Sequence, residues 1–468
     1  MSTRDWPTAP LSDVCSLVTD GTHHSPENRP QGEYMYVTAK NIRPYGLDLS
    51  NITYVDSDTH NEIYARCPVE CGDVLYIKDG ATTGLAAVNH LEKPFSLLSS
   101  VALLKPKRNI LDPEYLKNWL NCPATMEALT GQMTGSAIRR LVLKQIRKAE
   151  VPLPPLSEQR RIVEKIEALA TRSRRAREAL DTLPALIDRY RQSILAAAFR
   201  GDLTTKGQVS DGRKLASDAG LYPIPQEWKW AAMQDLVSFG PQNGLYLPKS
   251  KYGSGHPILR INDFQDHSSA TADEFRKVEL SKFEQEVYGL SVGDIVINRV
   301  NAPSHLGKCM VVSERHVPAV FESNMMRLRV KGNVPARYVA YFLKSPEGRK
   351  ALLSNAKWAV NQASINQGDV LATPIPIPAD SAEMMEIVNR IESALTKIEA
   401  FEAGMVSTFD RLATLDQSIL AKAFRGELVP QDPNDEPASV LLERIRAERA
   451  AAGPAPRRGR RPKAAGGG

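Results

Sequence analysis

The sequence predicts an α+β fold in which two similar mixed α/β domains are separated by two long antiparallel coiled-coil helices, with pseudo-two-fold symmetry. The first observation is an internal repeat. Twelve residues from Gln192 (QSILAAAFRGDL) recur 225 positions later from Gln417 (QSILAKAFRGEL), with ten positions identical. The second is a heptad pattern before each copy. The third is a stretch of about 150 residues before each heptad region, in which short apolar runs are separated by Gly, Asn and Pro. So long a repeat indicates a duplicated half-chain, because solenoid units run about 20–50 residues.

The two heptad regions predict long helices that pair with each other. Seam positions step by four and three residues through both regions at the same offset of 225, and an average step of 3.5 is the coiled-coil period. Pro155 and Asp380 mark the starts, and Gly201 and Gly426 follow the ends. Two amphipathic helices buried in ordinary globular domains are the alternative. The residues expected in coiled-coil and partner contacts are Ile162, Ile166, Leu169, Leu180, Leu183, Ile187, Ile194, Ile387, Ile391, Ile398, Leu412, Leu415 and Ile419.

The regions before the helices align loosely with each other. YVTAKNI from Tyr36 corresponds to ILRINDF from Ile258, and CGDVLYI from Cys71 corresponds to VGDIVIN from Val292. Framework positions agree while loop residues differ, which is typical of one fold carrying two specificities. The predicted organisation is a first domain at 1–155, a helix at 156–203, a linker at 204–225, a second domain at 226–379, a helix at 380–428, and a C-terminal segment with a disordered basic tail at 429–468. The linker is long enough to permit other paths, so antiparallel pairing is favoured rather than forced.

Composition favours a soluble intracellular protein. The chain has 468 residues, enough for two or three domains, and has neither a run of 18 apolar residues nor an apolar signal core near Met1. Five cysteines without metal spacing indicate reduced thiols. The net charge of +6 equals the charge carried from Glu443 onward, so any nucleic-acid affinity in the rest of the chain must come from local patches.

Motifs for catalysis are missing from the sequence. KDGATTG from Lys78 has glycines but lacks the Lys-Ser/Thr ending of a phosphate-binding loop. The Asn-Pro-Pro-aromatic tetrapeptide of adenine methyltransferases is absent, and His23 and His24 have no nearby acidic or Cys ligands at metal spacing. We therefore expect no catalytic residues and no metal site in this chain.

Several motifs in combination resemble the specificity subunit of type I restriction–modification systems. They are VPLPPLSEQRRIVEKIEAL from Val151, the two QSILA-x-AFRG-[DE]-L ends, PIPQEWKW from Pro223, DGTHHSP from Asp20, GDVLYIKDGATTG from Gly72, GSAIRRL from Gly135 and ASVLLERIRAERAAA from Ala438. The resemblance covers nearly the whole chain. In the second half ADSAEMMEIVNRI replaces the LSEQ-type entry and AVNQASINQGD replaces the GSAIRRL loop, so carry-over to that half is weaker.

The resemblance implies that each mixed domain is a target recognition domain reading one half of a split DNA site. The paired helices would set the spacer and dock two methyltransferase subunits, which methylate adenine after base flipping, and motor-nuclease subunits would join that core. S-adenosylmethionine, ATP and Mg would be bound by those partners and not by this chain. A cytoplasmic, prokaryotic location follows, without a membrane partner.

Side chains that present paired donors and acceptors are suited to reading base edges, with Arg for guanine and Asn or Gln for adenine. The residues expected to contact DNA are Thr22, His23, Lys40, Asn41, Lys78, Ser136, Arg139 and Arg140 in the first domain, and Gln242, Asn243, Arg260, Asn262, Asn298, Arg299, Asn301, Asn361 and Gln362 in the second. Each of these could instead be a turn residue or an ordinary surface polar group. Two other classes of protein remain alternatives: a coiled-coil adaptor that binds proteins, and an enzyme in its own right.

Overall fold

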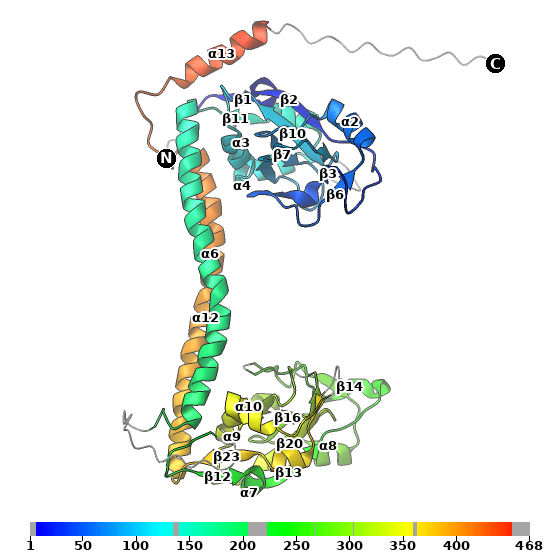
Figure 1. Ribbon diagram of the computed structural model, residues 1–468, viewed down its shortest axis with the longest axis vertical. Helices are drawn as coiled ribbons and strands as arrows, with labels where there is room; N and C mark the ends of the chain where they lie inside the picture. The colour runs from blue at the N-terminus through cyan, green and yellow to red at the C-terminus, as the bar shows by residue number, and fades with distance from the viewer. Residues whose placement is uncertain are drawn as a thin grey trace, which may run out of the picture. The chain divides into compact units, whose positions relative to one another are not determined.

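The computed structural model describes residues 6–133, 140–204, 222–266, 268–302, 304–358 and 363–451. It divides into two compact units: unit 1 comprises Met1–Ala179 with Ser407–Gly468, and unit 2 comprises Leu180–Val406. Two helices of 44 residues each, α6 (Leu156–Phe199) and α12 (Ser381–Phe424), contribute one part to each unit (Figure 1). Both begin and end within four residues of the predicted helices.

The globular part of unit 1, called domain 1 below, is a mixed α/β fold. A four-stranded antiparallel sheet has the order β2-β10-β7-β8, and a smaller sheet has the order β6-β3-β9. Its elements are β1 (Thr8–Pro10), α1 (Leu11–Val14), β2 (Cys15–Asp20), β3 (Tyr34–Val37), η1 (Ala39–Asn41), β4 (Ile42–Arg43), β5 (Gly46–Leu47), β6 (Thr53–Val55), α2 (Ser57–Arg66), β7 (Val74–Ile77), β8 (Ala86–Val88), β9 (Ser96–Leu97), β10 (Val101–Pro106), α3 (Pro113–Leu120), α4 (Pro123–Thr130), α5 (Leu143–Lys148) and β11 (Glu150–Pro152).

The four-stranded sheet of domain 1 is buried on both faces. Along β7, Val74 and Tyr76 pack into the core shared with the helices, whereas Leu75 and Ile77 pack into a second core on the opposite face. Burial on both faces explains why this strand reads as a continuous apolar run rather than an alternating one.

The globular part of unit 2, called domain 2 below, repeats this plan with the strand orders β13-β20-β16-β18 and β15-β14-β19. Its elements are β12 (Lys229–Ala232), α7 (Met233–Leu236), β13 (Val237–Asn243), η2 (Lys249–Lys251), β14 (Tyr252–Leu259), β15 (Arg276–Val278), α8 (Lys282–Tyr288), β16 (Ile295–Asn298), β17 (Val300–Asn301), β18 (Cys309–Val311), η3 (Glu314–His316), β19 (Val320–Phe321), β20 (Met325–Val330), α9 (Ala336–Lys344), α10 (Pro346–Leu352), β21 (Lys357–Trp358), β22 (Ala363–Ser364), α11 (Gln367–Leu371) and β23 (Pro374–Ile377). A further sheet, β17-β22-β21, occurs here.

Strand register confirms the alignment predicted between the two domains. Tyr36 pairs with Ser96 in the parallel β3–β9 ladder, and Ile258 pairs with Val320 in the parallel β14–β19 ladder. The position after each central strand agrees as well. The Leu141 amide donates to the carbonyl that follows β7, and the Ile365 amide donates to the carbonyl that follows β16.

Polar framework contacts also recur. Buried Asp73 pairs with Lys105 at 2.8 Å, and buried Asp294 pairs with Arg329 at 2.8 Å. Because the carboxylate of Asp73 is desolvated, burial raises its pKa, and hydrogen bonds from Lys105 and from a backbone amide oppose that rise. A charge buried at the same place in both domains, with a cation beside it, indicates one framework used twice.

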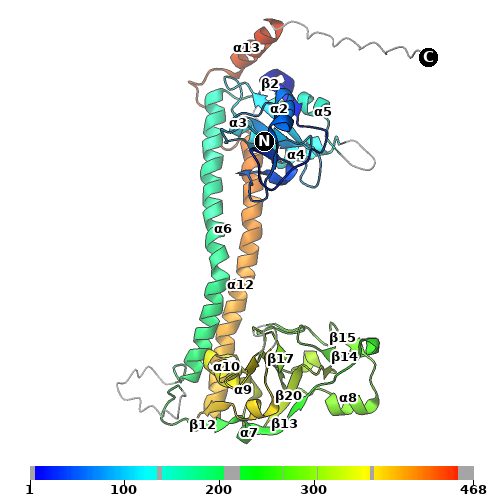
Figure 2. The same ribbon diagram turned by 45° about the vertical axis from the view of Figure 1, so that its right-hand side comes forward.

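The long helices pair antiparallel within each unit, as predicted (Figures 1 and 2). In unit 1, Arg177 bonds Asp416 at 2.6 Å, and in unit 2, Arg191 bonds Glu402 at 2.6 Å. The seam isoleucines are buried: Ile162, Ile166, Ile187, Ile194, Ile387, Ile391, Ile398 and Ile419. Leu169, Leu180, Leu183 and Leu412 are partly buried. Leu415 departs from this pattern, because it is 49% exposed.

The C-terminal segment of unit 1 packs on domain 1. Its helix α13 (Ala438–Ala451) buries Leu441 and Ile445 in the core of domain 1. Asp435 anchors the preceding loop to the start of α6, where it accepts hydrogen bonds from Ser157 at 2.5 Å and from Arg161 at 2.6 Å. The basic tail predicted to be disordered lies outside the described residues after 451. Among the helices that the structure describes, none combines the length and apolarity needed to span a membrane.

Candidate nucleic-acid interface

Polar residues gather where the central strands of each four-stranded sheet meet their loops. We call this the polar edge. In domain 1 it is the place where β2 and β7 end and β10 begins, and in domain 2 the place where β13 and β16 end and β20 begins. Asp20 lies opposite Ala102, and Asn243 lies opposite Met326, the matching position of β20. The polar edges are therefore equivalent places on one fold, with different side chains.

A glycine follows each of these strand ends for a steric reason. A Cβ on Gly21 would lie 1.9 Å from the Leu97 carbonyl oxygen, and a Cβ on Gly244 would lie 2.3 Å from the Glu322 carbonyl oxygen. Such distances are far below van der Waals contact, so no larger residue fits without moving the backbone. The glycines let the loop after β2 or β13 cross close to the chain that leads into β10 or β20.

In domain 1 a single buried carboxylate organises the polar edge. The Asp20 side chain is 3% exposed, and its Oδ1 accepts a hydrogen bond from Nη2 of Arg66 at 2.6 Å. The ammonium of Lys78 lies 3.4 Å from Oδ2, and Nε2 of His23 lies 3.4 Å from Oδ1. Asp79 lies 3.8 Å from the same ammonium. The donors of Arg66, Lys78 and His23 thus gather around one buried carboxylate, and N–H donors of this kind are suited to phosphate or to base-edge acceptors.

The remaining predicted contacts of domain 1 have mixed positions. Lys40 and Arg140 are exposed, and Thr22 is half-buried, with its backbone amide donating to the carbonyl of Leu97. Asn41 is buried, and its side-chain amide is bonded within the domain: its oxygen accepts from the Thr38 amide and its nitrogen donates to the Asp48 carbonyl. The predicted residues Ser136 and Arg139 lie outside the described residues.

In domain 2 the structure corrects the position of Asn298. This residue is 0% exposed, and within the described residues neither its amide oxygen nor its nitrogen has a hydrogen-bond partner. It occupies the position of Ile77 in domain 1, on the strand face that packs into an apolar core. A buried, unpaired amide cannot reach a base, and it costs stability.

Gln242 is also committed to the interior of domain 2. Its carbonyl accepts from the buried guanidinium of Arg327, and its nitrogen donates to the Val287 carbonyl at 3.3 Å. Burial lowers the pKa of Arg327, and the neighbouring Asp294 opposes that shift. The Cζ atom of Arg327 lies over the ring of Phe239, 5.0 Å from its centroid. Arg327 therefore connects β20 to the loop before β16.

The other predicted residues of domain 2 spread over its polar edge. Asn243 and Asn262 are exposed. Arg260 is held by Asp263 at 2.8 Å, and Arg299 donates to the Ser323 carbonyl at 3.1 Å. Asn301 is half-buried, and its oxygen accepts from the next backbone amide. The predicted residues Asn361 and Gln362 lie outside the described residues.

Sequence reasoning missed Asp20 and Arg66 in domain 1, and Arg327 and Trp358 in domain 2. Asp20 could have been found from its place before Gly21, which matches Asn243 before Gly244. Arg66 carries no such signal, because it ends α2 and is 46 positions from the residue it contacts. Trp358 is 59% exposed on β21, and β22 separates it from β17, the strand that carries Asn301.

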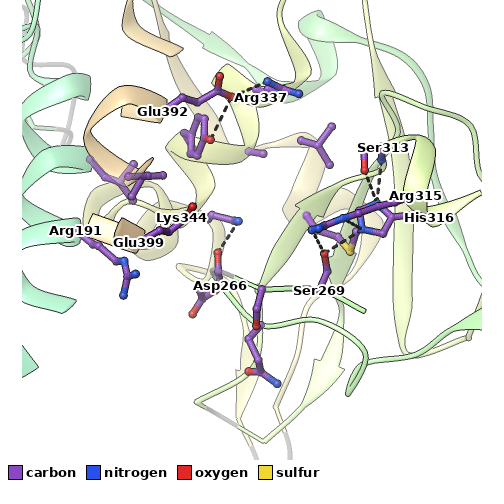
Figure 3. A pocket seen from close by; sticks show the side chains of 18 residues that line it. Arg191, Asp266, Ser269, Ser313, Arg315, His316, Arg337, Lys344, Glu392 and Glu399 are labelled. Atoms are coloured by element: carbon purple, nitrogen blue, oxygen red, sulfur yellow. Dashed lines mark hydrogen bonds and ion pairs between the residues drawn. The ribbon is translucent and has the colours of Figure 1, made fainter. Parts of the chain in front are cut away.

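A polar cleft in unit 2 has its own charge balance (Figure 3). It holds about 340 Å³ between α9, the strand β18 and the two long helices. Arg337 bonds Glu392 at 2.8 Å, and Lys344 donates to the Asp266 carbonyl at 2.7 Å. Burial and the adjacent Arg315 lower the pKa of His316. Arg337 and Lys344 thus bond to groups of the protein itself. We therefore assign them to the packing of domain 2 against the long helices. Over the parts of the chain described, no group of three or more His, Cys, Asp or Glu could hold a metal ion.

Comparison with known proteins relates this chain to one class of protein. Residues 3–179 match the model of the type I restriction modification DNA specificity domain. The chain is 28% identical over 463 residues to the StySPI specificity subunit of Salmonella potsdam, and 26% identical over 461 residues to the EcoKI specificity subunit of Escherichia coli K12, covering 96% of each protein.

Solved structures agree on the fold. A chain from a study of complex assembly and conformational transition in a type I restriction–modification system matches with a TM-score of 0.63 and 21% identity, over 91% of this chain and 100% of that one. The HsdS subunit of Thermoanaerobacter tengcongensis matches with a TM-score of 0.56 and 20% identity, over 91% and 97%. The chain is thus similar, over 96% of its length, to specificity subunits of type I restriction–modification systems, and it shares their fold.

Proposed function

We propose that this chain is the sequence-reading subunit of a type I restriction–modification complex, in which each domain reads one half of a bipartite DNA site. The observation that carries the proposal is the pair of polar edges. They stand on one framework, yet they present different side chains: Asp20 against Asn243, and Lys78 against Arg299. A shared scaffold with divergent edge residues is what two half-site specificities require. Within this proposal the exposed residues His23, Lys40, Arg140, Asn243, Asn262 and the partly buried Arg299 are the contact candidates.

Two apolar grooves on the long helices support docking of two copies of one partner. The groove in unit 1, of about 400 Å³, is lined by Leu169, Leu412 and Leu415 among others, and the groove in unit 2, of about 490 Å³, by Ile187 and Tyr190. The internal repeat relates them, because Ile187 and Leu412 are 225 positions apart, as are Tyr190 and Leu415.

Exposed apolar seam residues in repeat-related grooves fit one partner surface used twice. We assign these grooves to two methyltransferase subunits, with motor-nuclease subunits joining that core. The partners supply S-adenosylmethionine, ATP and magnesium, the chain itself contributes no catalytic residue, and the complex works in the prokaryotic cytoplasm. A protein-binding coiled-coil adaptor would also use the grooves, but it would have no use for two divergent polar edges.

The direct test is to select duplexes from a randomised pool with the chain assembled with its methyltransferase subunit. We expect two short specified blocks separated by an unspecified spacer of fixed length. If no sequence is enriched among the recovered duplexes, the proposal that the chain reads DNA sequence is overturned, and the adaptor is favoured.

The role of the helices as a ruler has a test of its own. Inserting one heptad in a single long helix shifts one end of the pair by about 10 Å, since the α-helix rises 1.5 Å per residue. We expect recognition to be lost. An unchanged site with an unchanged spacer would count against the ruler.

A further inference from the structure

Tyr246 is the most exposed large hydrophobic side chain among the residues that the structure describes, at 86%. It lies in the loop that follows β13 and Gly244, so it belongs to the polar edge of domain 2. An aromatic ring stabilises a fold mainly by burying its area, and a ring this exposed contributes little in that way. Its place at the polar edge therefore calls for a role outside the fold.

The backbone around Tyr246 is held by hydrogen bonds, so the exposure of its ring is a property of the fold. The Leu245 amide donates to the Phe321 carbonyl at 2.9 Å, and the Ser323 amide donates to the Leu245 carbonyl at 2.8 Å. Leu245 is buried, Leu247 is partly buried, and both pack into the same small core of domain 2. Because the residues on both sides of Tyr246 pack inward, its ring is held on the outer side of the loop.

The equivalent residue of domain 1 is His23. Leu245 forms a parallel bridge with the residue that follows β19, just as Thr22 forms one with the residue that follows β9. The next position is therefore His23 in one domain and Tyr246 in the other, and both side chains are exposed. One framework thus presents an imidazole at one polar edge and a phenol ring at the other, which is the kind of difference that two specificities require.

The charges beside Tyr246 favour a nucleic acid as the partner of this ring. Lys249, on η2, is exposed, and the Ser323 carbonyl, next to the same loop, accepts from Arg299 at 3.1 Å. Glu322 also lies against the loop, but its partly buried carboxylate accepts from a backbone amide at 2.7 Å. Cations that can contact phosphate, together with an aromatic ring that can contact bases, are the combination found on nucleic-acid-binding surfaces.

A duplex offers one apolar group to such a ring in its major groove. The base edges there present hydrogen-bond donors, hydrogen-bond acceptors and the C5 methyl of thymine, and apolar side chains contact that methyl. Burial of one methyl-sized group changes affinity by about 4-fold, the equivalent of roughly 0.8 kcal/mol. An exposed ring at a DNA-reading edge is therefore suited to selecting thymine.

We propose that Tyr246 reads a thymine in the half-site of domain 2, through contact of its ring with the C5 methyl. This inference rests on the proposed function, because it names a base that one of the two domains selects. An exposed tyrosine that contacts the sugar–phosphate backbone or the methyltransferase subunit is the competing explanation. Neither of those contacts depends on the thymine methyl.

The test uses the chain assembled with its methyltransferase subunit and duplexes that carry the selected site. In each duplex one thymine is replaced by uracil, which removes the C5 methyl and keeps the base-pairing edge. We expect the wild type to bind about 4-fold more weakly when the uracil replaces the thymine that Tyr246 contacts. Tyr246→Phe keeps the ring and should keep this uracil penalty. Tyr246→Ala, and Tyr246→His with the residue of domain 1, should remove it at that position alone.

Two further chains serve as controls. Val292→Ala should leave every uracil penalty unchanged, because Val292 is 57% exposed before the start of β16, at the opposite end of that strand from the polar edge. A chain in which a second copy of residues 1–155 replaces residues 226–379 loses the half-site of domain 2 and so identifies it.

Three results would overturn the inference. They are a wild type without any uracil penalty in the half-site of domain 2, a Tyr246→Ala variant that keeps every penalty of the wild type, and an equal loss of affinity for every duplex in Tyr246→Ala. The last result is the behaviour of a phosphate or partner contact. If the wild type itself selects no site, the proposed function fails, an outcome distinct from failure of the assignment of Tyr246.

Discussion

Domains 1 and 2 show which parts of a duplicated fold stay fixed and which are free to differ. The buried Asp73–Lys105 and Asp294–Arg329 pairs occupy matching places. At the polar edge, only a few residues away, the two domains differ: the buried Asp20 of domain 1 corresponds to the exposed Asn243 of domain 2. Contacts that hold strands together are therefore shared, whereas contacts directed outward differ. That division is expected if both domains keep one architecture and select different ligands.

Breaking the shared framework should have the largest effect. Gly21→Ala and Gly244→Ala place a Cβ against backbone carbonyl oxygens, at 1.9 and 2.3 Å. We expect each to destabilise its own domain by about 3 kcal/mol or more, measured by thermal and denaturant unfolding. Gly332→Ala is the control, because a Cβ there meets no atom within 4 Å. Wild-type stability in both variants would show that the close crossing is not required.

Exchanging the residues that end the two central strands should sharpen the comparison. Ile77→Asn buries an unpaired amide in place of an apolar side chain, and we expect a loss of roughly 2–3 kcal/mol. Asn298→Ile removes an amide that is buried without a partner, so we expect a gain of about 1 kcal/mol in the free energy of unfolding. Denaturant midpoints measure both, and a destabilised Asn298→Ile would show that the asparagine makes a stabilising contact.

The buried tyrosines of α3 and α9 should behave alike. Tyr115 donates to the Pro152 carbonyl at 3.1 Å, and Tyr338 donates to the Pro376 carbonyl at 2.6 Å. Removing either hydroxyl leaves a carbonyl without its partner, so Tyr115→Phe and Tyr338→Phe should each cost about 1–2 kcal/mol. Unfolding of the two variants under one set of conditions makes the comparison. A cost in one domain and none in the other would argue against a common framework.

The smallest expected effect concerns the segment that follows α12 and bonds to the start of α6. In unit 1, the hydrogen bond from Arg161 holds the pKa of the Asp435 carboxyl below its ordinary value. A depressed carboxylate pKa stabilises the folded state above the unfolded pKa, and this contribution disappears as pH falls through the lower folded value.

We therefore expect hydrogen exchange in Val429–Ala451 to increase more below about pH 4 in the wild type than in Asp435→Asn. In unit 2 the segment that follows α6 contacts the start of α12 through a hydroxyl, because Thr204 donates to Glu383 at 2.6 Å. Equal acid sensitivity of the C-terminal segment in the wild type and in Asp435→Asn would remove the ion pair as its cause.

Much of the fold could be predicted from the sequence, because it depends on periodicity and repetition. The heptad steps located α6 and α12 within four residues of their ends. Matching runs such as YVTAKNI and ILRINDF also occupy matching strands. These features are one-dimensional, since spacing along the chain determines which face a residue occupies.

The contact residues could not be predicted as well, because side-chain burial depends on the third dimension. Asn41 and Asn262 look alike in the sequence, yet Asn41 caps a turn inside the domain and Asn262 is exposed. Strand register explains the difference, because the residue of domain 2 equivalent to Asn41 is Asp263 and not Asn262. The Asp263 carboxylate accepts from the Arg260 amide, just as the Asn41 oxygen accepts from the Thr38 amide. Similarly, Arg66 meets Asp20 only because the fold brings the end of α2 next to the end of β2.

The most direct measurement is a methylated-base map of DNA from cells that express the methyltransferase subunit with either the native chain or a chimera. In the chimera a second copy of residues 1–155 replaces residues 226–379. The account predicts methyl-adenine at a split, asymmetric motif for the native chain, and at two copies of the first half-motif for the chimera. A native motif without an unspecified spacer, or a chimera that keeps the native motif, would contradict the claim that each domain reads its own half-site.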